Sequence, residues 1–173
     1  VVQLLLQKGL GAAGVAIDSA PPKGVLSLKY SFLKSNWPVV SPFARKREPF
    51  LPSFEQFRYA FAHTLPEAEA RAAYDALVVP ESRLVGNGPT TEAARIDFQA
   101  PRPPLLLLAG AEDHIIPASL NRSNFERYRK APAVTELEEL PGRVHFVLGQ
   151  RGWEEVADRA LAWAAAHSGG APK

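Results

Sequence analysis

The sequence contains no cysteine and no methionine among its 173 residues. The absence of cysteine excludes disulfides, cysteine-bound zinc and a thiol nucleophile within this chain. It is also compatible with a reducing compartment, so we expect a cytoplasmic location. No apolar run approaches the ~20 residues that a helix needs to span a bilayer, so no transmembrane segment is expected.

A strong excess of charge of one sign is lacking as well. The chain has 20 basic and 18 acidic residues, which gives a formal net charge of +2. Nucleic-acid-binding domains usually carry a clustered basic stripe. The one basic cluster here, Arg45-Lys46-Arg47, is followed at once by Glu48. We therefore expect a surface turn at this cluster and no nucleic-acid partner.

The chain opens on what looks like the interior of an amphipathic helix. Residues 1–6 read VVQLLL, with no capping residue and no signal-peptide charge pattern. Together with the missing methionine, this opening predicts that the 173 residues begin partway through a larger domain. Such a piece would leave a strand edge and apolar faces uncovered, so we expect it to self-associate.

Helices and strands are expected to alternate along much of the chain. Two apolar runs and one alternating run predict strands at 13–17 (AGVAI), 105–109 (LLLLA) and 134–140 (VTELEEL). Helices are predicted at 1–8, 53–61, 67–77, 118–130 and 153–167. This order predicts an α/β fold with a mainly parallel sheet, in which 134–140 lies near the sheet edge.

Residues 24–97 have a different character. They contain several prolines and many aromatic side chains but no strand alternation. We expect a mostly helical insertion here, with residues 1–23 and 98–173 forming the core. Phe57, Tyr59 and Phe61 could line an apolar pocket. The alternative is that these rings form the core of the insertion and its seam with the sheet.

A carboxylate and an imidazole follow two of the predicted strands. GAEDHIIP at 110–117 contains Asp113, and PGRVHF at 141–146 contains His145. Functional groups in open α/β sheets gather at the carboxyl ends of the strands. A carboxylate there can hold the tautomer of an imidazole while the other ring nitrogen takes a proton from a nucleophile. The alternative is that Asp113 caps a turn and His145 lies on the surface.

These two segments resemble the acid and histidine segments of the α/β-hydrolase family, whose triad runs in the order nucleophile, acid, histidine. Asp113 matches the family acid and His145 the family histidine, while Glu112 and His114 are weaker candidates beside the acid. Residues 1–22 look like the helix and strand that follow the nucleophile turn. The resemblance implies a partial α/β-hydrolase fold with 24–97 as its helical cap or lid.

The resemblance also implies a nucleophile that this sequence does not contain. The family motif G-x-S-x-G would stand directly before the first helix, upstream of Val1. Ser168 fits a related pattern but follows a helix, and Ser19 is followed by prolines that prevent a strand-to-helix turn. We therefore expect these residues alone to be inactive toward esters. No pattern in the sequence suggests a binding partner for the side chain of His63, so we expect it to be exposed.

The function that the resemblance implies is a serine hydrolase acting on an ester or related acyl compound, without a metal or organic cofactor. Asp113 would orient His145, and the upstream serine would form an acyl-enzyme with a small, apolar acyl substrate. Two alternatives stay open. An upstream aspartate nucleophile would make the protein a dehalogenase or epoxide hydrolase, and a truncated chain could be a non-catalytic binding module.

Overall fold

The computed structural model of the protein describes residues 1–41, 43 and 47–170. Arg45 and Lys46 of the basic cluster lie outside the described residues, as do the last three residues of the chain. At the centre is a three-stranded parallel sheet with the order β1-β4-β5. Its strands are β1 (Gly14–Ile17), β4 (Leu105–Gly110) and β5 (Thr135–Leu140). The predicted α/β fold with a parallel sheet is confirmed, and β5 is an edge strand as expected.

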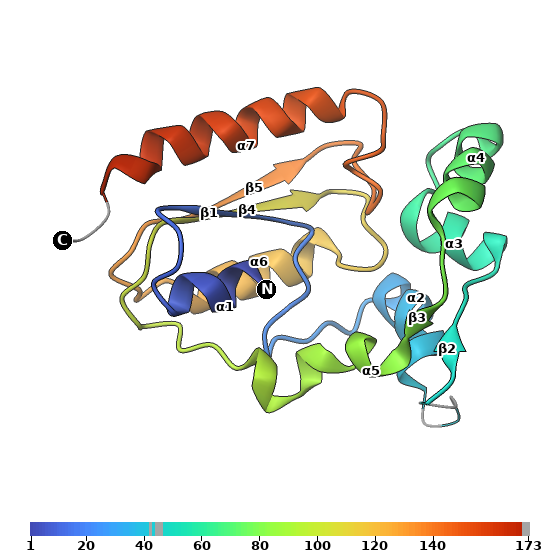
Figure 1. Ribbon diagram of the computed structural model, residues 1–173, viewed down its shortest axis with the longest axis horizontal. Coiled ribbons are helices and arrows are strands. Elements are labelled where there is room, and N and C mark those ends of the chain that lie inside the picture. The colour runs from blue at the N-terminus through green and yellow to red at the C-terminus, as the bar shows by residue number, and fades with distance from the viewer. Residues whose placement is uncertain (42, 44–46, 171–173) are drawn as a thin grey trace.

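Helices cover both faces of this sheet (Figure 1). The helices α1 (Val2–Gln7) and α6 (Ala118–Arg127) lie on one face, and α7 (Trp153–His167) lies on the other. The bounds of α7 agree with the prediction, whereas α6 ends before the expected Lys130. No helix among the described residues is long and apolar enough to cross a membrane.

The central strand β4 joins the two layers of helices. All six of its residues are buried. Leu105 and Leu107 pack toward α1 and the end of α6, whereas Leu106 and Leu108 pack toward α7. Side chains alternate between the two faces of a strand, so a strand covered on both sides must be apolar throughout. This requirement explains the unbroken run LLLLAG.

A group of short elements lies beyond the carboxyl ends of the strands (Figure 1). It comprises α2 (Tyr30–Val40), β2 (Pro49–Phe50), α3 (Phe54–Phe61), α4 (Glu67–Leu77), β3 (Glu81–Ser82) and α5 (Arg83–Gly86). The 3-10 turns Gly88–Thr90 and Glu92–Ala94 follow α5 and run back toward α1. Most of these elements are helices. The antiparallel pair β2–β3 is not predicted by the sequence, because two residues are too few to show alternation.

The sequence marks the helices of this group unequally. The first turn of α3 forms a capping box, in which Ser53 and Gln56 each accept a hydrogen bond from the backbone N–H of the other. In contrast, α2 has no buried residue and contains Pro38, which removes a backbone donor from the helix. The sequence therefore predicts α3 but gives no signal for α2.

The two edges of the sheet differ in chemistry. On β5, Glu138 and Glu139 form ion pairs with Arg159 and Arg122 of the flanking helices. Charged side chains of this kind discourage pairing with a further strand. β1 has the uncharged sequence GVAI, and no described strand pairs with its outer edge. The outer edge of β1 is therefore the more open of the two.

We expect the 173-residue chain to self-associate through β1, because unpaired backbone groups on an uncharged edge can pair with a second copy. Sedimentation velocity at rising protein concentration should show a growing share of dimers or larger species. The association should persist in high salt, which screens ion pairs but not strand pairing. A single monomeric species at every concentration would contradict this prediction.

Candidate active site

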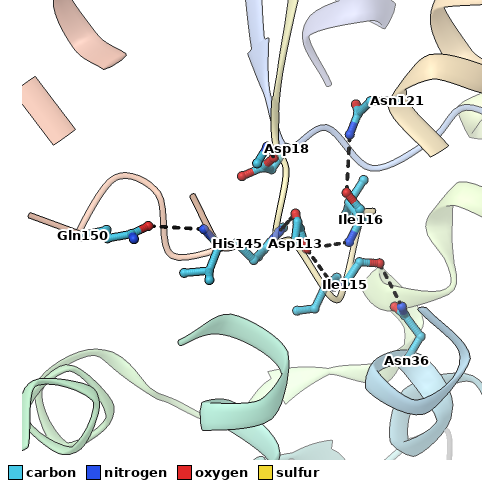
Figure 2. A network of polar contacts seen from close by, with 10 residues as sticks. Asp18, Asn36, Asp113, Ile115, Ile116, Asn121, His145 and Gln150 are labelled. Carbon is cyan, nitrogen blue, oxygen red and sulfur yellow. Dashed lines mark hydrogen bonds and ion pairs between the residues drawn. The ribbon is translucent and has the colours of Figure 1, made fainter. Parts of the chain in front are cut away.

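Asp113 and His145 are in contact at the carboxyl end of the sheet (Figure 2). They lie in the loops after β4 and β5, two strands that pair in parallel. Oδ2 of Asp113 is 2.7 Å from Nδ1 of His145, which is hydrogen-bond distance. The side chain of Asp113 is fully buried, and that of His145 is 21% exposed. The structure thus brings together the two residues that the strand-end rule selects.

Backbone donors fix the carboxyl of Asp113. Its Oδ1 accepts the N–H groups of Ile115 at 2.7 Å and Ile116 at 2.8 Å. The side chain of Asn36 in α2 in turn donates to the carbonyl of Ile115 at 3.2 Å. Asp113 therefore does cap a turn, as the alternative interpretation held, and the same carboxyl also holds the histidine. The two interpretations are compatible because they use different oxygens.

Gly110, the last residue of β4, allows the two loops to approach each other. The N–H of Glu112 donates to the carbonyl of Arg143 at 3.0 Å. A Cβ atom on Gly110 would lie only 2.7 Å from that same carbonyl oxygen. Backbone atoms cannot rotate out of the way, so a larger residue would push the loop of His145 outward. The missing side chain at Gly110 therefore sets the spacing between the two loops.

Contacts from another direction hold the loop that carries His145. The side chain of Gln150 accepts the N–H of Val144 at 3.2 Å. The N–H of Phe146 donates to the carbonyl of Phe61 at 3.0 Å, which ties the loop to the end of α3. The ring of Phe61 also meets the imidazole edge to face, with centroids 5.0 Å apart. The orientation of His145 thus depends on residues both before and after it in the sequence.

The bond to Asp113 decides which nitrogen of His145 can act as a base. A carboxylate oxygen can only accept a hydrogen bond, so Nδ1 must donate. A neutral His145 then keeps its lone pair on Nε2. No described residue is hydrogen-bonded to Nε2, so this atom is available to a partner.

A second carboxyl, which the sequence analysis did not select, stands beside the pair (Figure 2). Asp18 directly follows β1 and is 7% exposed. Its Oδ1 accepts the N–H of Gly110 at 2.6 Å. One carboxyl oxygen of Asp18, one of Asp113 and one ring nitrogen of His145 all lie within 4.8 Å of one another. The signal that points to Asp18 is its place at a strand end, although the following prolines indicate only a turn.

Burial and charge act together on the titration of this cluster. Burial lowers the pKa of His145, but the hydrogen bond and charge of Asp113, with the charge of Asp18 when that carboxyl is ionised, outweigh it and hold the pKa of His145 above its ordinary value. Burial and the repulsion of Asp113 raise the pKa of Asp18 from 3.8 to about 7. The hydrogen bond from Gly110 and the charge of His145 oppose that rise only in part.

The same three side chains are the kind that can bind a metal ion. Their donor atoms are already engaged, however. Asp113 accepts three hydrogen bonds, one of them from Nδ1 of His145, and Asp18 accepts one from Gly110. A cation on Nδ1 would have to displace the bond to Asp113, because a nitrogen that donates a proton cannot ligate. The arrangement fits a hydrogen-bonded cluster better than a metal site.

The two weaker candidates beside Asp113 make other contacts. Glu112 is exposed. Nδ1 of His114 lies 2.8 Å from the carbonyl of Tyr59, and its ring stacks on His63 with centroids 3.7 Å apart. The expectation that His63 is exposed is wrong, because the ring is half-buried against a loop distant in sequence. Burial and the nearby His114 lower the pKa of His63.

The three aromatic residues of α3 that were expected at a pocket have different surroundings. Phe57 belongs to a buried cluster that also contains Val144 from the loop before His145. Tyr59 packs near His114, with ring centroids 4.7 Å apart. Of the three, Phe61 is the one that contacts His145. Phe57 therefore belongs to the seam between α3 and the loop after β5, and Phe61 borders the candidate site.

Neither of the serines considered from the sequence is bonded to the pair. The hydroxyl of Ser19 donates to the carbonyl of Ala20, and that of Ser168 donates to the carbonyl of Ala165. A cavity of about 340 Å³ is lined by α1, Ala20–Pro22 and residues 85–96, and one of about 360 Å³ by α3 and α4. Neither cavity includes Asp113 or His145.

The sequence matches no family model and no curated protein. Among solved structures, the chain is similar to a monoacylglycerol lipase from Paleococcus ferrophilus, with 21% identity and a TM-score of 0.49 over 88% of this chain and 58% of that chain. It is also similar to a meta-cleavage product hydrolase from Pseudomonas fluorescens, with 15% identity and a TM-score of 0.52 over 89% of this chain and 55% of that chain.

The second of these likenesses identifies the fold. The parallel sheet β1-β4-β5 and its flanking helices form part of an α/β-hydrolase fold. The chain spans little more than half the length of each of the two similar structures. The described site accordingly belongs to one portion of such a fold.

The contact at Gly110 can be tested by adding one methyl group. Gly110→Ala should destabilise the chain by about 1–3 kcal/mol through overpacking. It should also weaken the NMR signal of the proton between Asp113 and His145. Gly88→Ala is the matched control, because a Cβ there has no neighbour within 4 Å. Equal thermal stability of the two variants, with the signal intact in both, would show that the loops can shift freely.

The bond between Asp113 and His145 also predicts how stability depends on pH. The pKa of folded His145 is raised above its unfolded value, near 6.5. The stability gained from the protonated ring is therefore complete below that value and is lost as pH rises through the folded pKa. The free energy of unfolding, measured by denaturant titration, should exceed that of His145→Gln most at acid pH. A gap that widens toward alkaline pH would contradict this assignment.

Proposed function

We propose that Asp113 and His145 are the acid and base of a Ser-His-Asp triad, and that the serine comes from a part of the protein outside these 173 residues. The observation that carries the proposal is the 2.7 Å bond between Oδ2 of Asp113 and Nδ1 of His145 at adjoining strand ends. The fold supports it, because this chain corresponds to 55% of a similar hydrolase and the rest of such a fold can supply a nucleophile.

In this proposal His145 first acts as a general base. Nε2 takes the proton of the serine hydroxyl while Oγ attacks the acyl carbon of the substrate. The ring then carries a positive charge, which the buried carboxylate of Asp113 stabilises through the Nδ1–H bond. Because Oδ1 of Asp113 is held by two backbone N–H groups, the carboxyl need not reorient as this charge appears.

His145 next acts as a general acid. Nε2 returns the proton to the departing alkoxide, which leaves an acyl-enzyme on the serine. Water then gives a proton to Nε2 and attacks the acyl carbon, and the serine recovers its proton as the acid product leaves. The 173 residues alone lack the serine and the donors to the oxyanion. Each such donor is worth about 3–4 kcal/mol, so the isolated chain should be inactive toward esters.

The same proposal gives residues 24–97 the role of a lid over the pair. Two contacts support it: the hydrogen bond from Phe146 to the carbonyl of Phe61, and the Phe61 ring against His145. An aromatic ring at this place would favour an apolar acyl group beside Nε2. The expected substrate is therefore a small ester or related acyl compound with an apolar acyl part.

Two other functions remain compatible with this geometry. If an aspartate supplied the nucleophile, His145 would activate only water, and the protein would be a dehalogenase or an epoxide hydrolase. If no nucleophile faces Nε2, the chain would be a binding module. The availability of Nε2, with Nδ1 held by Asp113, favours a catalytic role over the binding module.

The proposal is tested by the kinetics of ester hydrolysis in the full-length protein. With p-nitrophenyl butyrate, Asp113→Asn and His145→Gln should each lower kcat by roughly 10³-fold or more, since each removes a group that acts in the transition state. Glu112→Gln is the matched control for Asp113→Asn, because it makes the same change at the exposed neighbouring position. It should leave kcat within a few-fold.

Covalent labelling then identifies the nucleophile. A fluorophosphonate probe should label one serine of the full-length protein, and labelling should be lost in His145→Gln. Turnover of a haloalkane or an epoxide without labelling would point to an aspartate nucleophile. An Asp113→Asn variant as active as Glu112→Gln would remove Asp113 from the mechanism.

A further inference from the structure

Three neighbouring strand ends each contribute one titratable side chain to a single cluster. Asp18 follows β1, Asp113 follows β4 and His145 follows β5. The proposed mechanism uses Asp113 and His145 and leaves Asp18 without a role. A buried carboxyl that no cation neutralises is unfavourable in a protein interior, so its presence calls for an explanation.

The backbone holds Asp18 in an unusual conformation. Its φ angle is 41°, the one positive φ at a non-glycine position among the described residues. Aspartate tolerates this region better than most residues but still adopts it at a cost. The conformation coincides with the 2.6 Å bond from the N–H of Gly110 to Oδ1, which fixes where the carboxyl lies. Asp18 is therefore anchored beside Asp113 rather than free to turn away.

The charges around Asp18 do not balance if both carboxyls are ionised. The charged groups that act on it are Asp113 and His145, and no lysine or arginine is bonded to it within the described part of the chain. One imidazolium can offset only one of the two carboxylates. Oδ2 of Asp18 is buried and has no donor among the described residues. A proton on Oδ2 would remove the excess charge and would supply a donor.

The carboxylate of Asp113 can accept one more hydrogen bond, from a proton on Oδ2 of Asp18. A carboxylate offers about four acceptor positions. Three of these are used, by the N–H groups of Ile115 and Ile116 and by Nδ1 of His145. The carboxyl of Asp18 is a neighbour of that of Asp113, since one oxygen of each falls within the 4.8 Å cluster, and a hydrogen bond with Asp113 is among the causes that raise the pKa of Asp18.

We propose that Asp18 is present as a neutral carboxylic acid that donates its Oδ2 proton to Asp113 and so positions Asp113 for His145. This inference rests on the proposed function of the pair. Asp18 is a positioning residue, since it acts on His145 only through Asp113. The group that accepts its proton is a carboxylate of the same chain, and the proposed mechanism transfers no proton from Oδ2.

The expected titration of the cluster agrees with this assignment. Burial and the repulsion of Asp113 raise the pKa of Asp18 from 3.8 to about 7. A carboxyl whose folded pKa is raised stabilises the fold below its unfolded pKa, and this stability is lost as pH rises through the folded value. The chain should therefore lose stability between about pH 4 and 7 because of Asp18.

The test uses the 173-residue chain and needs no substrate. Asp18→Asn keeps an acceptor for Gly110 and replaces the acidic proton with a neutral amide donor. In this variant the NMR-measured pKa of His145 should stay within about half a unit of wild type. The infrared band of a protonated carboxyl should disappear, and so should the loss of stability between about pH 4 and 7. Asp75→Asn, on an exposed face of α4, is the matched control and should change none of these.

An ionised Asp18 would give different results in the same measurements. If Asp18 were ionised, Asp18→Asn would remove a buried negative charge near the imidazole and would lower the pKa of His145 by roughly 1–3 units. A carboxyl band unchanged in Asp18→Asn would also overturn the proposal. Asp18→Ala, which offers no donor to Asp113, should weaken the signal of the Asp113–His145 proton while Asp18→Asn preserves it. Because these measurements do not involve turnover, they can fail or succeed independently of the kinetic test.

Discussion

The close passage of Gly110 beneath the carbonyl of Arg143 is the constraint on which the candidate site depends. Parallel pairing of β4 with β5 brings two strand ends to the same edge, but it does not by itself bring their loops into contact. That contact requires a residue without a side chain at the end of β4, because a Cβ there would lie 2.7 Å from the Arg143 carbonyl. The bond between Asp113 and His145 follows from this approach. A single backbone contact therefore controls the separation of Asp113 and His145.

The charges of Asp18, Asp113 and His145 act on one another. Asp113 is surrounded by donors from its own turn and from His145, and this environment suits an ionised carboxylate. The same charge makes ionisation of Asp18 unfavourable, and burial adds to that effect. The hydrogen bond and charge of Asp113 in turn hold the pKa of His145 above its ordinary value against the effect of burial. The protonation of Asp18 and that of His145 thus each depend on the neighbouring groups of the site.

The elements beyond the strand ends add a second set of constraints on His145. The carbonyl of Phe61 binds the backbone next to the histidine, and the ring of Phe61 packs against the imidazole. On the other side of the site, Asn36 in α2 binds the turn that holds Asp113. Residues 24–97 therefore contact both halves of the pair. A movement of this segment would therefore alter the surroundings of Asp113 and of His145.

The sequence by itself determined the features that depend on local periodicity and on breakers. The unbroken apolar run of β4, the bounds of α4 and α7, the cap of α3 and the choice of Asp113 and His145 at strand ends all follow from short stretches of residues. Only the tertiary structure decided that β1 lies next to β4, which brings Asp18 to the pair. It also decided the stacking of His63 on His114 and the formation of α2 without a buried face. The physical reason is that these contacts join segments far apart in the chain. Their energy arises from packing and desolvation between surfaces, and no single stretch of sequence carries it.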